Sequence, residues 1–140
     1  MSNESPSEGL IVLQSDRSIE DVIARLRQML AAHNLRVFAD LDFSADAAAE
    51  GVPLRPTRML IAGNPKAGTA LIDAVPAAAI DLPLKVLVWS DAGVTRVAYN
   101  DPQYIGHRHG LPADLVHNIA GFGALVEKAA DGLGMGSIKP

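Results

Sequence analysis

The chain has 140 residues, of which 49% are apolar and 20% are charged, and its formal net charge at pH 7 is −4. This length suits one domain with a single core, and the apolar content is too high for a disordered chain. The negative charge and the 4% aromatic content argue against a nucleic-acid partner, which needs a basic surface and stacking platforms. Cysteine is absent, which excludes thiol catalysis, disulfides and thiolate metal sites.

The two ends of the chain give the expected domain organisation and location. Residues 1–9 are polar and acidic and lack the basic and apolar regions of a secretory leader. The longest apolar runs are far shorter than the roughly 20 residues that cross a bilayer. We therefore expect a cytoplasmic protein with no membrane partner, built from a flexible leader at 1–9, a single domain at 10–131 and a flexible tail at 132–140.

The hydrophobic patterns predict an α+β domain. Apolar residues at three- and four-residue spacing indicate helices, alternation indicates strands, and glycine or proline indicates the connections. In chain order, the patterns predict a strand at 10–13, a helix at 19–30, a strand at 35–43, a short helix at 44–50, a strand at 59–62, a short helix at 71–79, a hairpin of strands at 85–89 and 94–99, and a closing helix at 111–130.

The long strand at 35–43 should join the hairpin strands in one antiparallel sheet that the first and last helices cover, because connections are short and hydrophobicity is one-faced. Strict alternation would place Phe43 on the apolar face of this strand and Asp40 and Asp42 together on the other face. Two neighbouring carboxylates could hold a metal or carry out acid–base chemistry, or they could form an ordinary solvated ion pair.

The segment from Gly63 to Thr69 has two glycines five apart, which is similar to a phosphate-binding loop. It lacks lysine directly after the second glycine, and Pro65 removes one backbone donor, so we do not expect nucleotide hydrolysis. As the start of a helix the segment could still hold an anion, with help from the charge of Lys66. The alternative is a purely structural turn that Asn64 caps.

Two histidines, His107 and His109, would point the same way only on an extended backbone. A closed zinc site needs four ligands, and without cysteine the others would have to come from scattered positions. We therefore expect no metal and no cofactor. No serine stands in a nucleophile elbow or in a Ser-x-x-Lys pair, so the sequence gives covalent catalysis no support.

Several short runs stand out between about Leu10 and Leu125: Val37–Asp42, Arg55–Thr57, Gly63–Thr69, Ile80–Lys85, Tyr99–Pro102 and Arg108–Leu111. In this order they resemble the domain of unknown function 302 family. The resemblance implies a curved, mostly antiparallel sheet with helices packed on one face, a TATA-binding-protein-like fold of the β-α-β(4)-α type, and it implies no activity. The family usually has histidine where this chain has Phe43, and phenylalanine removes the donor, the acceptor and the titrating group.

From these features we expect a non-enzymatic domain that binds a small anionic or amphipathic ligand between the sheet and its helices. One alternative is a small enzyme that uses Asp42, Lys66 and His109, and another is a structural homodimer module. The homodimer is expected from the alanine-rich apolar composition and from the family resemblance. The predicted ligand-binding residues are Asn64, Lys66, Gly68, Thr69, Asp42 and Phe43.

Overall fold

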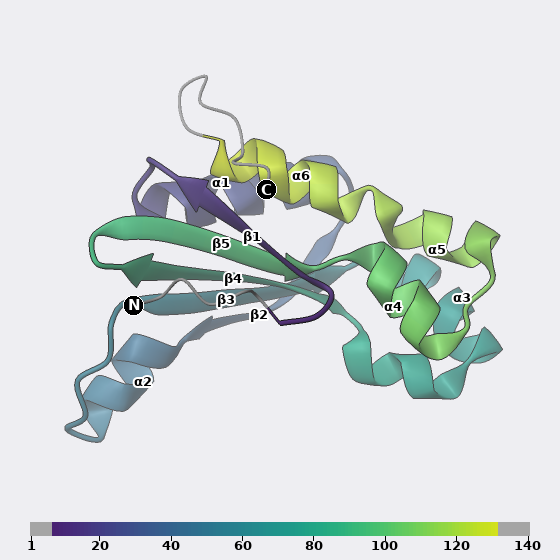
Figure 1. The fold of residues 1–140 in the computed structure, drawn as a ribbon, viewed down its shortest axis with the longest axis horizontal. Coiled ribbons are helices and arrows are strands. Elements are labelled where there is room, and N and C mark those ends of the chain that lie inside the picture. The colour runs from purple at the N-terminus through teal and green to yellow at the C-terminus, as the bar shows by residue number, and fades with distance from the viewer. Residues whose placement is uncertain (1–6, 132–140) are drawn as a thin grey trace.

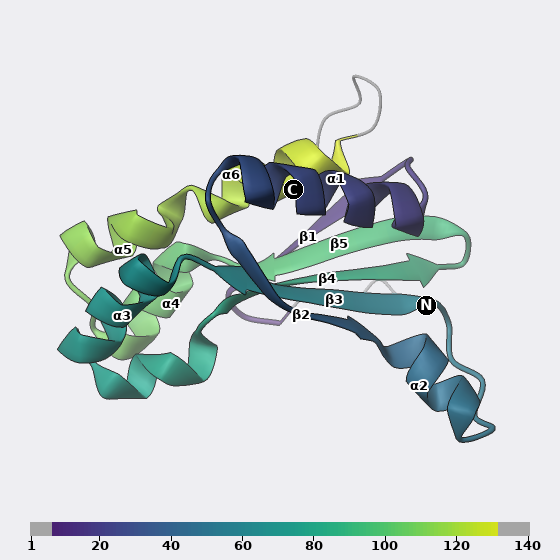
Figure 2. The same cartoon turned by 180° about the vertical axis from the view of Figure 1, so that it is seen from behind.

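A computed structural model describes residues 7–131 and places them in one five-stranded sheet with helices (Figures 1 and 2). The tail predicted at 132–140 and the first six residues of the predicted leader lie outside the described residues. The elements are β1 (Leu10–Ser15), α1 (Ile19–Ala32), β2 (Arg36–Asp42), α2 (Phe43–Ala49), β3 (Thr57–Gly63), α3 (Pro65–Ala74), the 3-10 helix η1 (Pro76–Asp81), β4 (Leu84–Asp91), β5 (Val94–Asn100), α4 (Pro102–His109), α5 (Ala113–Ala120) and α6 (Phe122–Ala130).

The sheet has the strand order β1-β5-β4-β3-β2, and every neighbouring pair is antiparallel. Helices α1 and α6 lie side by side over one face of it (Figures 1 and 2). The core forms between these helices and the sheet, where Leu60, Val86 and Val97 of three neighbouring strands are fully buried. The predicted α+β class, with a mostly antiparallel sheet and helices packed on one face, is therefore confirmed.

Strand β2 departs from strict alternation because it contains a bulge. Its register against β3 shifts between Val37 and Ala39, which leaves Phe38 as an extra residue. The bulge reverses which side chains face the helices. Beyond it, Asp40 and Asp42 lie on the α1 face, since Asp40 is opposite the buried Leu60. The prediction that these two carboxylates share a face is right, but the prediction that one apolar face runs from 35 to 43 is wrong.

Phe43 is the first residue of α2 rather than the last residue of a strand. The change occurs at Asp42, whose Oδ1 accepts hydrogen bonds from the Ser44 hydroxyl (2.7 Å) and the Ala45 N–H (2.9 Å). A carboxylate that accepts a first-turn N–H is a strong helix start. The predicted place of Phe43 on the apolar face of a strand is therefore wrong, and α2 projects from the end of the sheet with none of its residues buried (Figure 1).

The helical region at the other end of the sheet also differs from the prediction. The closing helix is divided at Gly121 into α5 and α6. Helix α4 was not predicted, although it begins at an Asp101–Pro102 pair and ends at Gly110, whose φ of 64° is left-handed. Because α4 is helical, its two histidines, two residues apart, do not point the same way.

Candidate functional site

A pocket of about 400 Å³ lies at the end of the sheet where β3 passes into α3. Its walls come from α3, the beginning of β2, the connection into β4, and the junction between α5 and α6. Most of its lining is apolar, and it includes Leu35, Phe38, Ile72, Leu82, Ile119 and Phe122. The polar side chains in the lining are those of His33, Asn64, Thr69 and Asn118.

Helix α3 begins within the Gly63–Thr69 segment, with Asn64 as its N-cap. The Asn64 Oδ1 accepts the N–H groups of Lys66 (2.9 Å) and Ala67 (3.3 Å), and the Asn64 carbonyl accepts that of Gly68 (2.9 Å). The Thr69 hydroxyl donates to a carbonyl of the same turn, that of Pro65 (2.7 Å). The chain itself therefore uses the first-turn donors that an anion would need.

Gly68 gives α3 a bare backbone where the helix lines the pocket. A Cβ built at Gly68 would meet nothing within 4 Å, so the glycine leaves open space in the pocket wall. Glycine inside a helix costs roughly 1 kcal/mol relative to alanine. Gly68 thus leaves space in the pocket wall but makes α3 less stable than alanine at the same position would.

The predicted ligand-binding residues fall in two places. Asn64, Gly68 and Thr69 line the pocket, whereas Lys66 is exposed and is not part of the lining. Asp42 and Phe43 lie at the other end of β2, since Asp42 is opposite Arg58. Gly63 is five positions along β3 from Arg58, which corresponds to roughly 17 Å. The six residues therefore do not form a single site.

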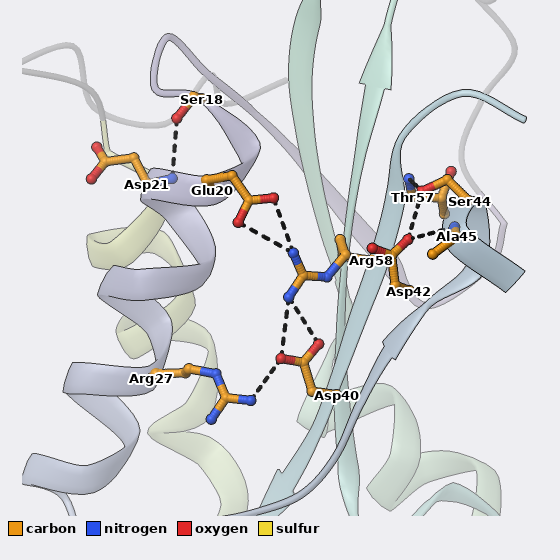
Figure 3. Close-up of polar contacts among 10 residues, drawn as sticks. All are labelled: Ser18, Glu20, Asp21, Arg27, Asp40, Asp42, Ser44, Ala45, Thr57 and Arg58. Atoms are coloured by element: carbon orange, nitrogen blue, oxygen red, sulfur yellow. Dashed lines mark hydrogen bonds and ion pairs between the residues drawn. The ribbon is translucent and has the colours of Figure 1, made fainter. Parts of the chain in front are cut away.

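The polar end of β2 is organised around Arg58 (Figure 3). Its Nη1 donates to Glu20 of α1 (3.1 Å) and its Nη2 donates to Asp40 of β2 (3.0 Å), while Arg27 donates to the other oxygen of Asp40 (2.6 Å). Burial acts to raise the pKa of Asp40, but hydrogen bonds and charges from Arg27 and Arg58 outweigh it and hold that pKa below its ordinary value. The network joins α1 to the edge strand β2 and to its neighbour β3.

His109, a member of the proposed catalytic set, lies in a separate ionic cluster. Its Nε2 is 2.6 Å from Oδ2 of Asp81, and Arg108 donates to the same oxygen (2.8 Å). This cluster connects α4 to η1, and neither His109 nor Asp81 lines the apolar pocket. Within residues 7–131, no three His, Cys, Asp or Glu side chains are grouped so that they could hold a metal ion.

Sequence reasoning missed three of the four walls of the pocket. One of them is the beginning of β2, with Leu35 and Phe38. Asn118 and Gly121 come from the junction of α5 and α6, and Leu82 comes from the connection into β4. The glycines of the closing helix were the available signal for the junction, because glycine weakens a helix locally. Among the helices within 7–131, none is both long enough and apolar enough to cross a membrane.

Comparison with a solved structure agrees with this architecture. The chain is similar to an uncharacterized conserved DUF302 protein from Bacillus stearothermophilus, with a TM-score of 0.74 over 89% of this chain and 97% of that chain. The sequence identity is 15%, so this likeness concerns the fold.

Sequence comparison adds relatives and the family. The chain is 32% identical over 127 residues to fluoride-specific ion channel FluC 1 of Brucella suis biovar 1 (strain 1330), covering 87% of this chain and 50% of that protein. It is also 32% identical to FluC 2 of Brucella melitensis biotype 1, covering 47% of that protein. The chain thus spans about half the length of these curated relatives. The family model for the domain of unknown function DUF302 matches residues 11–129, and the chain belongs to this family.

Proposed function

We propose that this domain binds a small amphipathic ligand in the apolar pocket beside α3 and is not itself an enzyme. The observation that carries the proposal is the pocket of about 400 Å³, whose largely apolar lining is interrupted by a few polar side chains. Small-molecule sites in proteins have this size and composition, with apolar walls for affinity and a few polar groups for orientation. Burial of apolar ligand surface would contribute roughly 25 cal/mol per Å².

The separation of the proposed catalytic residues favours binding over catalysis. Asp42 lies roughly 17 Å along the strand pair from the loop that carries Lys66. His109 is held by Asp81 outside the pocket. A general base must come within hydrogen-bond reach of the proton it removes, so these three groups could not act on one small substrate.

The head group of the ligand would meet Asn64, Thr69, His33 and Asn118, all of which can form hydrogen bonds. The first-turn N–H groups of α3 are already used, so an anionic head group would depend on these side chains rather than on a backbone cradle. The exposed Lys66 would contribute at most a screened charge from outside the lining.

Filling the pocket tests the proposal. Thermal unfolding would be followed with octanoate, decanoate and decanol as probes, for the wild type, Gly68→Leu and Ala74→Leu. A probe at about 100 times its Kd stabilises the native state by roughly 2.7 kcal/mol. Gly68→Leu should lose this stabilisation because its side chain occupies the pocket. Ala74→Leu adds the same side chain to an exposed position of the same helix and should respond like the wild type.

Retention of every probe-induced shift in Gly68→Leu would contradict the pocket assignment. Folding of the variant is checked independently by its melting temperature without a probe, which should not fall. The reason is that replacing a helix glycine with no neighbour within 4 Å improves helix propensity.

A second candidate function, a homodimer module, is favoured by the sheet face opposite α1 and α6. One row of cross-strand neighbours is apolar in all five strands of the sheet, and alternation directs it away from the buried face. The row spans about 19 Å across the strands. It consists of Val12, Ala98, Leu87, Met59 and Leu41.

A second copy of this chain fits the row better than other partners. A row that crosses the whole sheet matches an occupant of equal width, and two sheets pack face to face by interdigitating such side chains. Arg96 on this face is balanced by Asp91 (3.2 Å), which limits repulsion between identical faces, and the net charge of −4 disfavours nucleic acid. Two-fold self-association is also the commonest oligomer symmetry.

Light scattering tests the dimer. The wild type should have twice the chain mass at tens of micromolar protein, and Leu87→Arg, in the middle of the row, should have the monomer mass. Ile80→Arg is the matched control, because Ile80 is apolar and 70% exposed but lies on η1 away from the row. A wild-type monomer under these conditions would exclude the dimer module.

The cytoplasm is the compartment that we propose for this domain. The chain contains no cysteine, which suits a reducing environment in which disulfides do not form. Fractionation of cells that express the full chain would test this proposal, and recovery in an exported fraction would contradict it.

A further inference from the structure

A hollow of about 350 Å³, lined mostly by polar residues, lies at the end of the sheet opposite the apolar pocket. It is bounded by the first residues of α1, the Asp42–Ser44 segment where α2 begins, and the ends of β4 and β5. Figure 3 draws five of the lining side chains, those of Ser18, Glu20, Asp42, Ser44 and Arg58. We propose that this hollow is a second binding site, separate from the apolar pocket, and that its ligand is a small neutral polyol.

The floor of the hollow carries the hydroxyl groups of two facing residues. Ser90 and Thr95 are directly opposite each other near the end of the β4–β5 hairpin, and both line the hollow. Thr95 is 8% exposed, and within the described part of the chain its hydroxyl makes no hydrogen bond. Because a hydroxyl both donates and accepts, a ligand hydroxyl could form a hydrogen bond with Thr95 that the described part of the chain does not supply.

The wall toward α2 contains a carboxylate, that of Asp42, with one oxygen available to accept a hydrogen bond. The Oδ1 atom of Asp42 is occupied by Ser44 and Ala45, whereas its Oδ2 makes no hydrogen bond to any described residue. Hydrogen bonds from Ser44 and from the Ala45 N–H lower the pKa of Asp42 and so keep it ionised. A ligand hydroxyl that donates to an ionised carboxylate forms one of the stronger hydrogen bonds available in proteins.

The wall toward α1 can both accept and donate. Ser18 accepts the Asp21 N–H through its Oγ (3.1 Å), which leaves its own O–H free to donate. The guanidinium of Arg58 is fixed by Asp40 and Glu20, and its Nε is buried without a partner. The hollow therefore combines hydroxyls, one free carboxylate oxygen and a rigidly held guanidinium.

The charges of the lining select the class of ligand. Glu20 and Asp42 contribute two negative charges and Arg58 one positive charge, so the lining has a net charge of −1. This charge disfavours an anion, and the adjacent guanidinium disfavours a divalent cation. A neutral molecule with several hydroxyls fits what remains, because each hydroxyl can donate to Asp42 and accept from Ser90 or Thr95.

NMR of the full chain tests the site. Amide and Arg Nε–H resonances would be recorded during titration with D-glucose, D-ribose, myo-inositol and glycerol, and in separate titrations with inorganic phosphate and propylamine. We expect at least one polyol to shift Ser90, Thr95 and Arg58 together and saturably. Thr95→Val, which keeps the shape but removes the hydroxyl, and Asp42→Asn, which can still cap α2, should each weaken binding by about tenfold.

Thr69→Val is the matched control, because it removes a hydroxyl from the apolar pocket and should leave polyol binding unchanged. The inference is overturned if no polyol shifts these resonances, if Thr95→Val binds like the wild type, or if only phosphate or an alkylamine produces the shifts. The amphipathic-ligand proposal would survive any of these results, because its pocket lies at the other end of the β2–β3 pair.

Discussion

The β2–β3 pair has an apolar end and a polar end, and the bulge at Phe38 separates them. On the side toward Gly63, Phe38 is 43% exposed and forms part of the apolar pocket wall. On the other side, Asp40 and Asp42 lie on the α1 face, where Asp40 pairs with Arg58 and Asp42 is opposite Arg58 in the strand register (Figure 3). A single additional residue in an edge strand thus lets one short strand contribute to two surfaces of opposite chemistry, since a bulge reverses the faces of all following side chains.

The two ends also differ in why side chains of the protein leave the apolar pocket and the hollow unfilled. At the apolar end, glycines such as Gly68 and Gly121 leave space beside the backbone. At the polar end, ionic hydrogen bonds hold Arg58 so that its side chain forms a wall instead of filling the hollow. Removing the charge of Arg58 or Asp40 at the polar end should therefore destabilise the protein. Replacing Gly68 or Gly121 with alanine at the apolar end should stabilise it.

The largest effect is expected from Arg58→Met, which keeps much of the side-chain volume but removes the guanidinium. Arg58 is 15% exposed as a side chain and has two carboxylate partners, so its loss leaves Asp40 with Arg27 alone. We expect the free energy of unfolding, measured in urea at pH 7, to fall by about 2–3 kcal/mol. Arg27→Ala, at a side chain 47% exposed, should cost less than about 1 kcal/mol. Equal losses in the two variants would refute the central role of Arg58.

A smaller, pH-dependent effect should come from Asp40. Burial acts to raise the pKa of its carboxyl, but Arg27 and Arg58 hold that pKa below its ordinary value in the folded protein. The ionised carboxyl therefore contributes stability above the unfolded-state pKa of about 4, and this stability is lost as the pH falls through the folded-state pKa. In urea denaturation from pH 6 to pH 2.5, Asp40→Asn should be less stable than the wild type at pH 6, and the difference should shrink toward pH 2.5. A constant difference would contradict the ionic role.

The features that could be predicted from sequence are those with local signals. Ser18 as the N-cap of α1 and the Ala92–Gly93 turn between β4 and β5 both follow from residue types at adjacent positions. The bulge at Phe38 has no such signal, because Val37, Phe38 and Ala39 are three consecutive apolar residues and fit either register. Only pairing with β3 decides the register at that point.

The pocket shows the same limit. Asn64, Gly68 and Thr69 were found because they are close together in a recognisable turn sequence. Leu35 and Asn118, which complete other walls, are far away in the chain. Pairing of β2 with β3 brings Leu35 near, since Arg36 is opposite Gly63, and packing of α5 against α3 brings Asn118 near. Reading one sequence for periodicity can place a residue on a face of its own element, but it does not determine which distant elements meet there.

The smallest effects, and the only stabilising ones, are expected at the glycines of the apolar pocket. Gly68→Ala and Gly121→Ala add a methyl group where a Cβ meets nothing within 4 Å, and neither backbone is left-handed. Each should raise the free energy of unfolding by about 0.4–1 kcal/mol, because alanine restricts the unfolded chain and Gly68 also lies inside a helix.

Gly93→Ala separates available space from backbone conformation and is the control for both glycine variants. It has equally open surroundings but a φ of 88°, which strains alanine, so it should lower stability in the same urea experiment. If all three variants were destabilised, the glycines at 68 and 121 would not lower the stability of the protein, and this prediction would be wrong. If Gly68→Ala and Gly121→Ala are stabilised and Gly93→Ala is destabilised, both pocket glycines lower the stability of the native state while lining the proposed ligand site. Selection for stability alone would be expected to replace such residues.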